Sequence, residues 1–305
     1  MGGSARLAAV LRCCTASQLD AEPWSCTGVV LMTLGEREDV RMDVRALVFG
    51  DGNVVSGWGS LKVDSDGEWL DCIHYVPLVS ALRRPRSAYS VRLLGGDIGS
   101  VLGDRNDVGA TVTGVWRDDA IEVRSVAARP GPSPITPSSS TPPCPPPSSG
   151  WRRGRVDENL EFEFELRELL ANGAAVRVAT FRPSRDQAVL VVAATDVAAV
   201  ESALRPRFDG RLCVVQSRWT RAQVDDVKQV LLGHMRDWKV DAVGSGGMSD
   251  SGQPVVNAML VRVTPAIAEW ANTIDDDLLR LEPSIVPAGP ASGDASSAPR
   301  PTAAD

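Results

Sequence analysis

Short runs of alternating apolar and polar residues dominate the first 128 positions, and most of them are followed by glycine, aspartate or asparagine. Alternation with a period of two is typical of a strand with one buried face, and the polar breaks are typical of turns. We therefore predict strands at 26–35, 40–50, 54–63, 68–79 and 89–95, and a hairpin at 110–123. Closely spaced short strands of this kind favour a small all-β barrel or sandwich.

The hairpin at 110–123 carries a family resemblance. Its first strand ends in VTGVW and its second begins with IEV, and the hairpin follows the earlier predicted strands. This arrangement resembles the end of an OB-type barrel, and the resemblance covers residues 24–128. It implies a domain that binds an oligonucleotide or an oligosaccharide across the face of the barrel.

The second half of the chain mixes helical and strand periodicity. Helices are predicted at 159–173, 196–208, 220–238 and 266–274, and strands at 175–195 (a hairpin), 212–219, 238–246, 254–263 and 278–283. Thr195 or Asp196, Thr220, and Thr264 followed by Pro265 are the expected helix starts. The order strand–strand–helix–strand occurs twice, at 175–219 and at 238–283, which indicates an internal duplication of a ββαβ unit.

The runs VLVVAATDVAAVESAL and LCVVQSRWTRAQVDDVKQVL carry a second resemblance. Over residues 175–283 the pattern is similar to the duplicated propeptide of α-lytic-protease-like serine proteases. Members of that family use this region as a folding chaperone and inhibitor of the protease that follows. Only a polar tail follows residue 288 here, so the resemblance implies the architecture and a protease as the partner.

Proline, serine and glycine separate the two regions. The stretch at 128–150 is too rich in these residues to build a core, and its prolines favour an extended spacer. We predict a multidomain chain, an all-β OB-like barrel followed by an α+β domain with a duplicated ββαβ unit. The predicted boundaries are a disordered or partly helical N-terminus at 1–23, the barrel at 24–128, a linker at 129–150, the α+β domain at 151–288 and a disordered tail at 289–305.

Charge narrows the choice of partner. The 305 residues carry a formal net charge of −7, which disfavours a protein that binds nucleic acid mainly through phosphates. No segment approaches the ~20 apolar residues of a membrane span, so we expect a soluble, cytoplasmic protein that does not bind a membrane. A protein partner is the favoured expectation.

Candidate ligand-binding residues lie in the predicted barrel. Four aromatic side chains could stack on bases, and three arginines in the break after residue 82 could contact phosphates. The ligand-binding candidates are Trp58, Trp69, Tyr75, Trp116, Arg83, Arg84 and Arg86. The opposing interpretation places the aromatic rings in the core and the arginines in a solvated loop.

Catalytic and metal chemistry finds little support in the sequence. Cys72 and His74 share a strand face, as a nucleophile and base would, but two neighbours on the apolar face of a core strand are the commoner explanation. The cysteines, with no CxxC pair and only two histidines, do not fit a zinc site. We expect Cys26 and Cys72 to be free thiols, and predict no catalytic residues, no metal and no cofactor.

The overall expectation is a non-enzymatic binding or adaptor protein whose C-terminal domain docks a protein partner, with single-stranded oligonucleotide binding and an uncharacterised hydrolase as alternatives.

Overall fold

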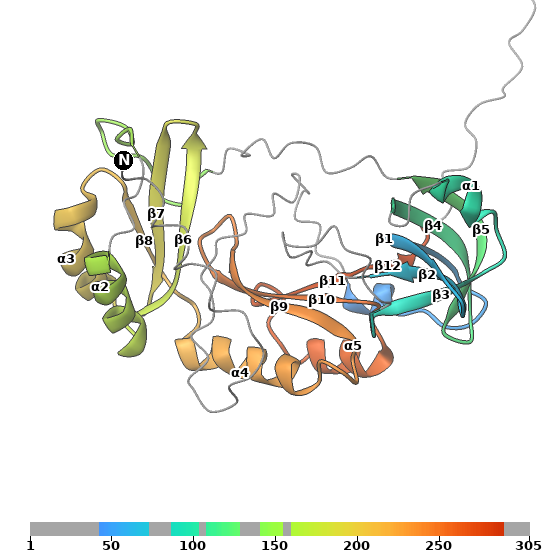
Figure 1. The fold of residues 1–305 in the computed structure, drawn as a ribbon. Helices are drawn as coiled ribbons and strands as arrows, with labels where there is room; N and C mark the ends of the chain where they lie inside the picture. The colour runs from blue at the N-terminus through green and yellow to red at the C-terminus, as the bar shows by residue number, and fades with distance from the viewer. Residues whose placement is uncertain (1–42, 73–86, 104–107, 129–140, 155–159, 290–305) are drawn as a thin grey trace, which may run out of the picture. The chain divides into compact units, whose positions relative to one another are not determined.

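The computed structural model describes residues 43–72, 87–103, 108–128, 141–154 and 160–289, and these residues build several β-sheets with few helices (Figure 1). The fold is a multidomain α+β arrangement, as predicted. The predicted strand at 26–35, the predicted N-terminal segment at 1–23 and the predicted tail at 289–305 lie outside the described residues, except for Gly289.

Sheet A is built from the first half of the chain and one late strand. Its strands follow the order β12-β1-β2-β3-β5-β4, with an additional pairing between β1 and β4. The strands are β1 (Val54–Asp64), β2 (Gly67–Asp71), β3 (Ser90–Leu94), β4 (Val108–Arg117), β5 (Ala120–Ala128) and β12 (Ile285–Pro287), and helix α1 (Ile98–Leu102) lies between β3 and β4. Adjacent strands are antiparallel except for β3 and β5.

The hairpin predicted at 110–123 is confirmed as β4 and β5. Asp118 and Asp119 both have positive φ, at 47° and 59°. A two-residue turn with positive φ at both positions matches the right-handed twist of the flanking strands. The register shift between Thr113 and Gly114 brings β5 close, since a Cβ on Gly114 would lie 2.3 Å from the carbonyl oxygen of Glu122.

Of two expectations for this region, one is wrong and one is not confirmed. The strand predicted at 40–50 is wrong at its centre, where the chain forms the 3-10 helix η1 (Val44–Leu47). The Asp43 carboxylate accepts a hydrogen bond from the backbone N–H of Arg45, and such local bonding competes with strand pairing. The predicted OB-like barrel is not confirmed, since sheet A takes β12 from residues beyond the predicted barrel.

Sheets B and C have the same topology. In sheet B the order is β6-β7-β8, and in sheet C it is β11-β10-β9. In each sheet the central strand is antiparallel to the strand before it and parallel to the strand after the helix. Sheet B consists of β6 (Ala175–Ser184), β7 (Gln187–Ala194) and β8 (Leu212–Gln216), with helix α3 (Val197–Phe208) between β7 and β8. Sheet C consists of β9 (Val240–Met248), β10 (Pro254–Leu260) and β11 (Leu279–Pro283), with helix α5 (Pro265–Ala271) between β10 and β11. The predicted duplication of strand–strand–helix–strand is therefore present.

Helix α2 (Leu160–Ala171) precedes sheet B, and α4 (Arg221–Gly233) joins the two repeats. The predicted helix starts are confirmed at Asp196, Thr220 and Thr264. Thr220 forms a capping box with Gln223, which satisfies two backbone donors at the start of α4. The helix starts in this half of the chain lie within one residue of the prediction, but α4 ends at Gly233, five residues before the predicted end at 238.

The hydrophobic clusters connect distant parts of the sequence. The core under sheet A includes Val261 and Ile285 from the end of the chain. The core between sheet C and helices α4 and α5 includes Leu47 from η1, and Val44 and Val48 pack against it. Residues from late in the chain therefore complete the core under sheet A, and residues of η1 complete the core of sheet C.

Candidate functional site

The outer face of sheet A holds two of the predicted ligand-binding residues. Trp58 and Trp69 are partly exposed. Cross-strand pairing places Lys62 and Arg92 directly opposite Trp69, on β1 and β3 respectively. Directly paired residues point to the same side of a sheet, so Trp69 lies between two cationic side chains on this face.

Trp69 is oriented by polar contacts. Its indole Nε1–H donates to a carboxylate oxygen of Asp64 at 3.1 Å, and the Arg92 guanidinium lies 6.0 Å from the ring centroid. The same Asp64 oxygen accepts a hydrogen bond from the backbone N–H of Asp66 in the β1–β2 turn. These contacts hold the ring at the surface, the orientation that a stacking platform requires.

A buried polar cluster borders this face. Asp71, which is 3% exposed, forms an ion pair with Lys62 and accepts hydrogen bonds from the hydroxyls of Ser87 and Ser90. A buried carboxylate is tolerated when it is paired and hydrogen-bonded in this way. The cluster joins the end of β2 to the start of β3. We assign it a structural role, because Asp71 bonds to Lys62 of β1, to Ser90 of β3 and to Ser87 just before β3.

The other predicted ligand residues do not extend this surface. Tyr75, Arg83, Arg84 and Arg86 lie outside the described residues. Trp116 is only 3% exposed and packs edge-on against Phe49, with ring centroids 5.2 Å apart. The Arg262 guanidinium lies 4.7 Å from the Trp116 ring and forms an ion pair with Asp119 at 3.0 Å. The Trp116 ring is therefore enclosed by protein, as the core interpretation expects.

Cys72 occupies a different environment from that of a nucleophile. It belongs to the core under sheet A, and its thiol faces the carbonyl oxygen of Leu70 at 3.7 Å. Burial raises the pKa of the Cys72 thiol from 9.0 to about 12. The thiolate is the reactive form of cysteine, so this environment opposes nucleophilic chemistry. His74, the proposed base, lies outside the described residues.

We expect iodoacetamide to leave Cys72 unmodified in the native protein at about pH 8 and to modify it after denaturation. The raised pKa keeps the thiol protonated in the folded state. Because unfolding restores the ordinary pKa, deprotonation favours the unfolded state only as the pH rises above 9.0 toward about 12. Peptide mass spectrometry of the Cys72 peptide, with and without denaturant, measures this. Rapid alkylation of native Cys72 would contradict the buried placement.

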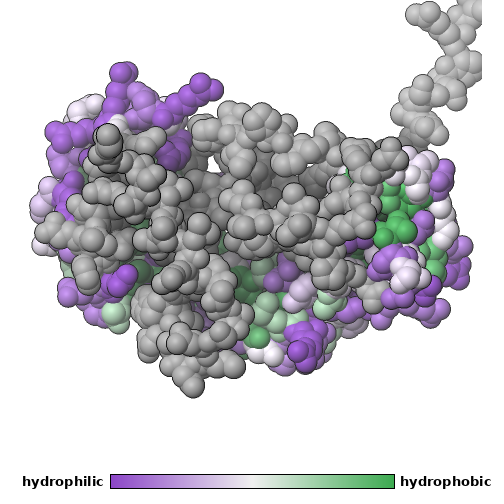
Figure 2. Space-filling model, viewed as in Figure 1, coloured by the Kyte–Doolittle hydropathy of each residue, from purple (hydrophilic) through white to green (hydrophobic). Residues whose placement is uncertain are grey.

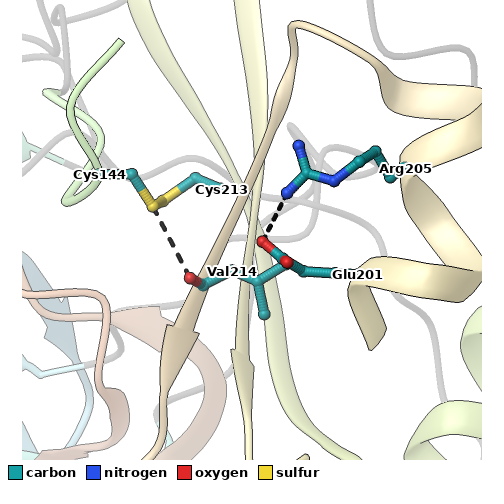
Figure 3. The surroundings of a disulfide bond; sticks show 5 residues. All are labelled: Cys144, Glu201, Arg205, Cys213 and Val214. Atoms are coloured by element: carbon teal, nitrogen blue, oxygen red, sulfur yellow. Dashed lines mark hydrogen bonds and ion pairs between the residues drawn. A yellow bond between two sulfur atoms is a disulfide. The ribbon is translucent and has the colours of Figure 1, made fainter. Parts of the chain in front are cut away.

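One cysteine pair was not predicted from the sequence. Cys144 and Cys213 form a disulfide, with Cα atoms 5.7 Å apart and a sequence separation of 69 (Figure 3). The Cys144 sulfur also lies 3.9 Å from the carbonyl oxygen of Val214. This contact is not a hydrogen bond, because both sulfurs belong to the disulfide and neither carries a proton. Cys144 belongs to the stretch predicted to be a free spacer, which is why no pairing was expected.

Strand β9 forms one edge of sheet C. The hydrogen bonds of its neighbour β10 show which backbone groups of β9 point away from the sheet. Val256 donates its N–H to Leu278, and Leu260 accepts from Ser284, so even-numbered residues of β10 point toward β11. Asn257 and Met259 then point toward β9, where they pair with Gly244 and Ala242. The N–H and C=O of Val243, between these two, point away from β10.

This edge carries few of the usual protective residues. Proteins shield edge strands with lysine, proline or covering elements. From Val240 to Met248 the sequence of β9 is VDAVGSGGM, in which Asp241 is the one charged residue and proline is absent. In the part of the chain that the structure describes, no strand pairs with the outer side of β9. A strand from another protein can extend a sheet at such an edge.

Other site classes gain no support. Across the described ranges, no group of three or more His, Cys, Asp or Glu side chains is placed to hold a metal ion. Within the same ranges, no helix is long and apolar enough to cross a membrane. Figure 2 shows hydrophobic surface over part of sheet A, and the exposed apolar residues of that sheet include Val63 and Leu94.

Comparison with known proteins gives no relative. The chain matches no protein-family model, no curated protein and no solved structure.

Proposed function

We propose that this chain is a non-enzymatic binding protein whose C-terminal domain docks a protein partner by strand addition at β9. The outer edge of β9, with which no described strand pairs, is the observation that supports the proposal. Main-chain hydrogen bonds to an added strand supply affinity without a deep pocket, and the N–H and C=O of Val243 point away from β10 toward this edge. A serine protease is the partner that the propeptide resemblance implies.

The proposal is tested by measuring inhibition of a panel of serine proteases by the full-length chain, using small peptide substrates. We expect at least one enzyme to be inhibited with an inhibition constant below about 1 μM. Replacing Gly244 by lysine should weaken that inhibition at least ~10-fold, because a lysine on an edge strand hinders the approach of another strand. A Cβ at Gly244 has room, with its nearest neighbour 3.6 Å away, so the variant should fold.

Gly289→Lys is the matched control. It adds the same charge at an exposed position where a new Cβ meets nothing within 4 Å, and it lies outside sheet C. Equal inhibition by the two variants would contradict docking at β9. No inhibition anywhere in the panel would remove the protease as the partner.

A second function is favoured by the position of Trp69 between Lys62 and Arg92. We propose that sheet A is an OB-like barrel that binds single-stranded oligonucleotide on this face. Two features support the barrel: β1 pairs with both β2 and β4, and β3 runs parallel to β5. The acidic net charge and the Asp71–Lys62 ion pair weigh against high affinity.

For this second function we expect Trp69→Ala to lose about 1–3 kcal/mol of binding energy for an oligothymidine probe, the usual value for one stacked base. Fluorescence anisotropy at low and high salt measures it, because phosphate contacts weaken as salt rises. Val63→Ala, on an exposed side chain of the same sheet, is the control. Absence of binding at low salt would end this candidate.

A further inference from the structure

Residues 141–151 cover one apolar face of sheet B. The first face of this sheet packs against α2 and α3. The second face presents Phe181, Val189, Val191 and Cys213, and the side chains of Cys144 and Trp151 pack onto it. Pro142 is buried as well, and Pro143 lies against Gly252 in the turn between β9 and β10. The end of the predicted spacer is therefore a cover on the repeat domain.

Few backbone hydrogen bonds hold this cover. Five of its residues are prolines, which have no N–H to donate: Pro142, Pro143, Pro145, Pro146 and Pro147. Gly150 donates to Pro147 inside the segment itself. Among the described residues, hydrogen bonds from the segment to sheet B and its loops begin at its end, where Gln187 donates to Trp151 and Arg152 donates to Gly210. The attachment at Cys144 is thus mainly covalent.

We infer that the Cys144–Cys213 disulfide is a latch that closes this cover in an oxidising compartment. In the reaction, the two thiols are oxidised to one disulfide while the disulfide of an oxidant is reduced to a dithiol. The Cys144 and Cys213 protons pass to that dithiol, so atoms and electrons balance. Disulfides of this kind persist where thiols are not kept reduced, which counts against the cytoplasmic location expected from the sequence.

The surroundings of the two sulfurs make the closed latch durable. Cys213 is 1% exposed, whereas Cys144 is partly exposed. An attacking thiolate therefore reaches the Cys144 sulfur, and the Cys213 thiolate must leave. That thiolate would form among Phe181, Val189 and Val191, which solvate a charge poorly. A poor leaving group slows thiol–disulfide exchange, so the bond opens slowly in the folded protein.

Hydrogen exchange on the full-length chain tests the latch, comparing the oxidised wild type with Cys144→Ser. We expect exchange in peptides that cover residues 148–154 to rise at least ~10-fold in the variant. Exchange in the strands of sheet A should stay unchanged. The binding of an apolar dye should rise in parallel, since the covered face of sheet B becomes exposed.

Two results would overturn the latch. Unchanged exchange at 148–154 would show that the cover stays closed without the bond. Equal acceleration of exchange in sheet A would show that the bond holds the whole fold rather than the cover. The Cys144→Ser/Cys213→Ser variant repeats the comparison without leaving a buried thiol at Cys213.

The redox state in cells is measured separately, by acid quenching, alkylation and peptide mass spectrometry. We expect the peptide that joins Cys144 to Cys213. Recovery of both residues as alkylated thiols would refute the oxidised working state. These outcomes are independent of protease inhibition, so failure of the latch and failure of the proposed function are distinguishable.

Discussion

Replacing both Cys144 and Cys213 by serine is expected to lower the free energy of unfolding by about 3–5 kcal/mol. The bond spans 69 residues of sequence, and cross-linking a chain over such a distance removes much of the entropy of its unfolded state. The loop contains α2, α3 and the first two strands of sheet B, so these elements should lose the most. Urea titration with far-UV circular dichroism as the readout measures the effect.

The wild type treated with a reductant is the matching condition. It should reproduce the stability of the double variant, because both lack the same covalent bond. A loss below about 0.5 kcal/mol, the range of ordinary surface substitutions, would contradict a stabilising role for the disulfide. Since natural domains are stable by about 5–15 kcal/mol, the variant should still fold in the absence of urea.

Ile285→Ala is expected to cost about 2–5 kcal/mol, the usual range for truncating a fully buried aliphatic side chain. Ile285 is in β12 and belongs to the core under sheet A, where it pairs with Gly57 of β1. A Cβ on Gly57 would lie 3.2 Å from Ile285, so the side chain fills the space that this glycine leaves. The cavity should therefore open within sheet A, although the substitution is near the other end of the chain.

Val63→Ala is the control for that experiment. Val63 is on the same strand as Gly57 but is 56% exposed, so its truncation should change stability by less than about 0.5 kcal/mol. Thermal unfolding followed by tryptophan fluorescence compares the two variants. Equal stability of Ile285→Ala and the wild type would mean that sheet A does not depend on β12.

Local signals predicted the repeat domain well. Asp196, Thr220 and Thr264 each have a side chain that accepts a hydrogen bond from the first turn of a helix, and such caps can be read from sequence. The turn at Asp118 and Asp119 was equally legible, because residues that tolerate positive φ stood between two apolar runs.

Long-range features were not predictable in the same way. Cys144 stands among prolines and serines, and nothing near it in the sequence points to Cys213. β12 has only three residues, too few to show a period. Residues 40–50 do alternate, but the Asp43 carboxylate accepts a hydrogen bond from the backbone N–H of Arg45 and caps a 3-10 turn there. For the candidate ligand face, the aromatic residues could be named, but whether a ring faced solvent or core depended on strand register. Trp69 and Trp116 differ in that respect, since Trp69 is partly exposed and Trp116 is buried.

The pairing of β1 with β12 also sets an order of events during synthesis. Val55 pairs with Pro287, so more than two-thirds of the 305 residues are added after β1 is synthesised and before its partner exists. Domains usually fold as they emerge, but residues 55–57 of β1 stay without their β12 partner until residue 287 has been made. Contacts between residues so distant in sequence also slow folding. We therefore expect ribosome-bound chains that end before residue 285 to hold sheets B and C in folded form while sheet A is still incomplete.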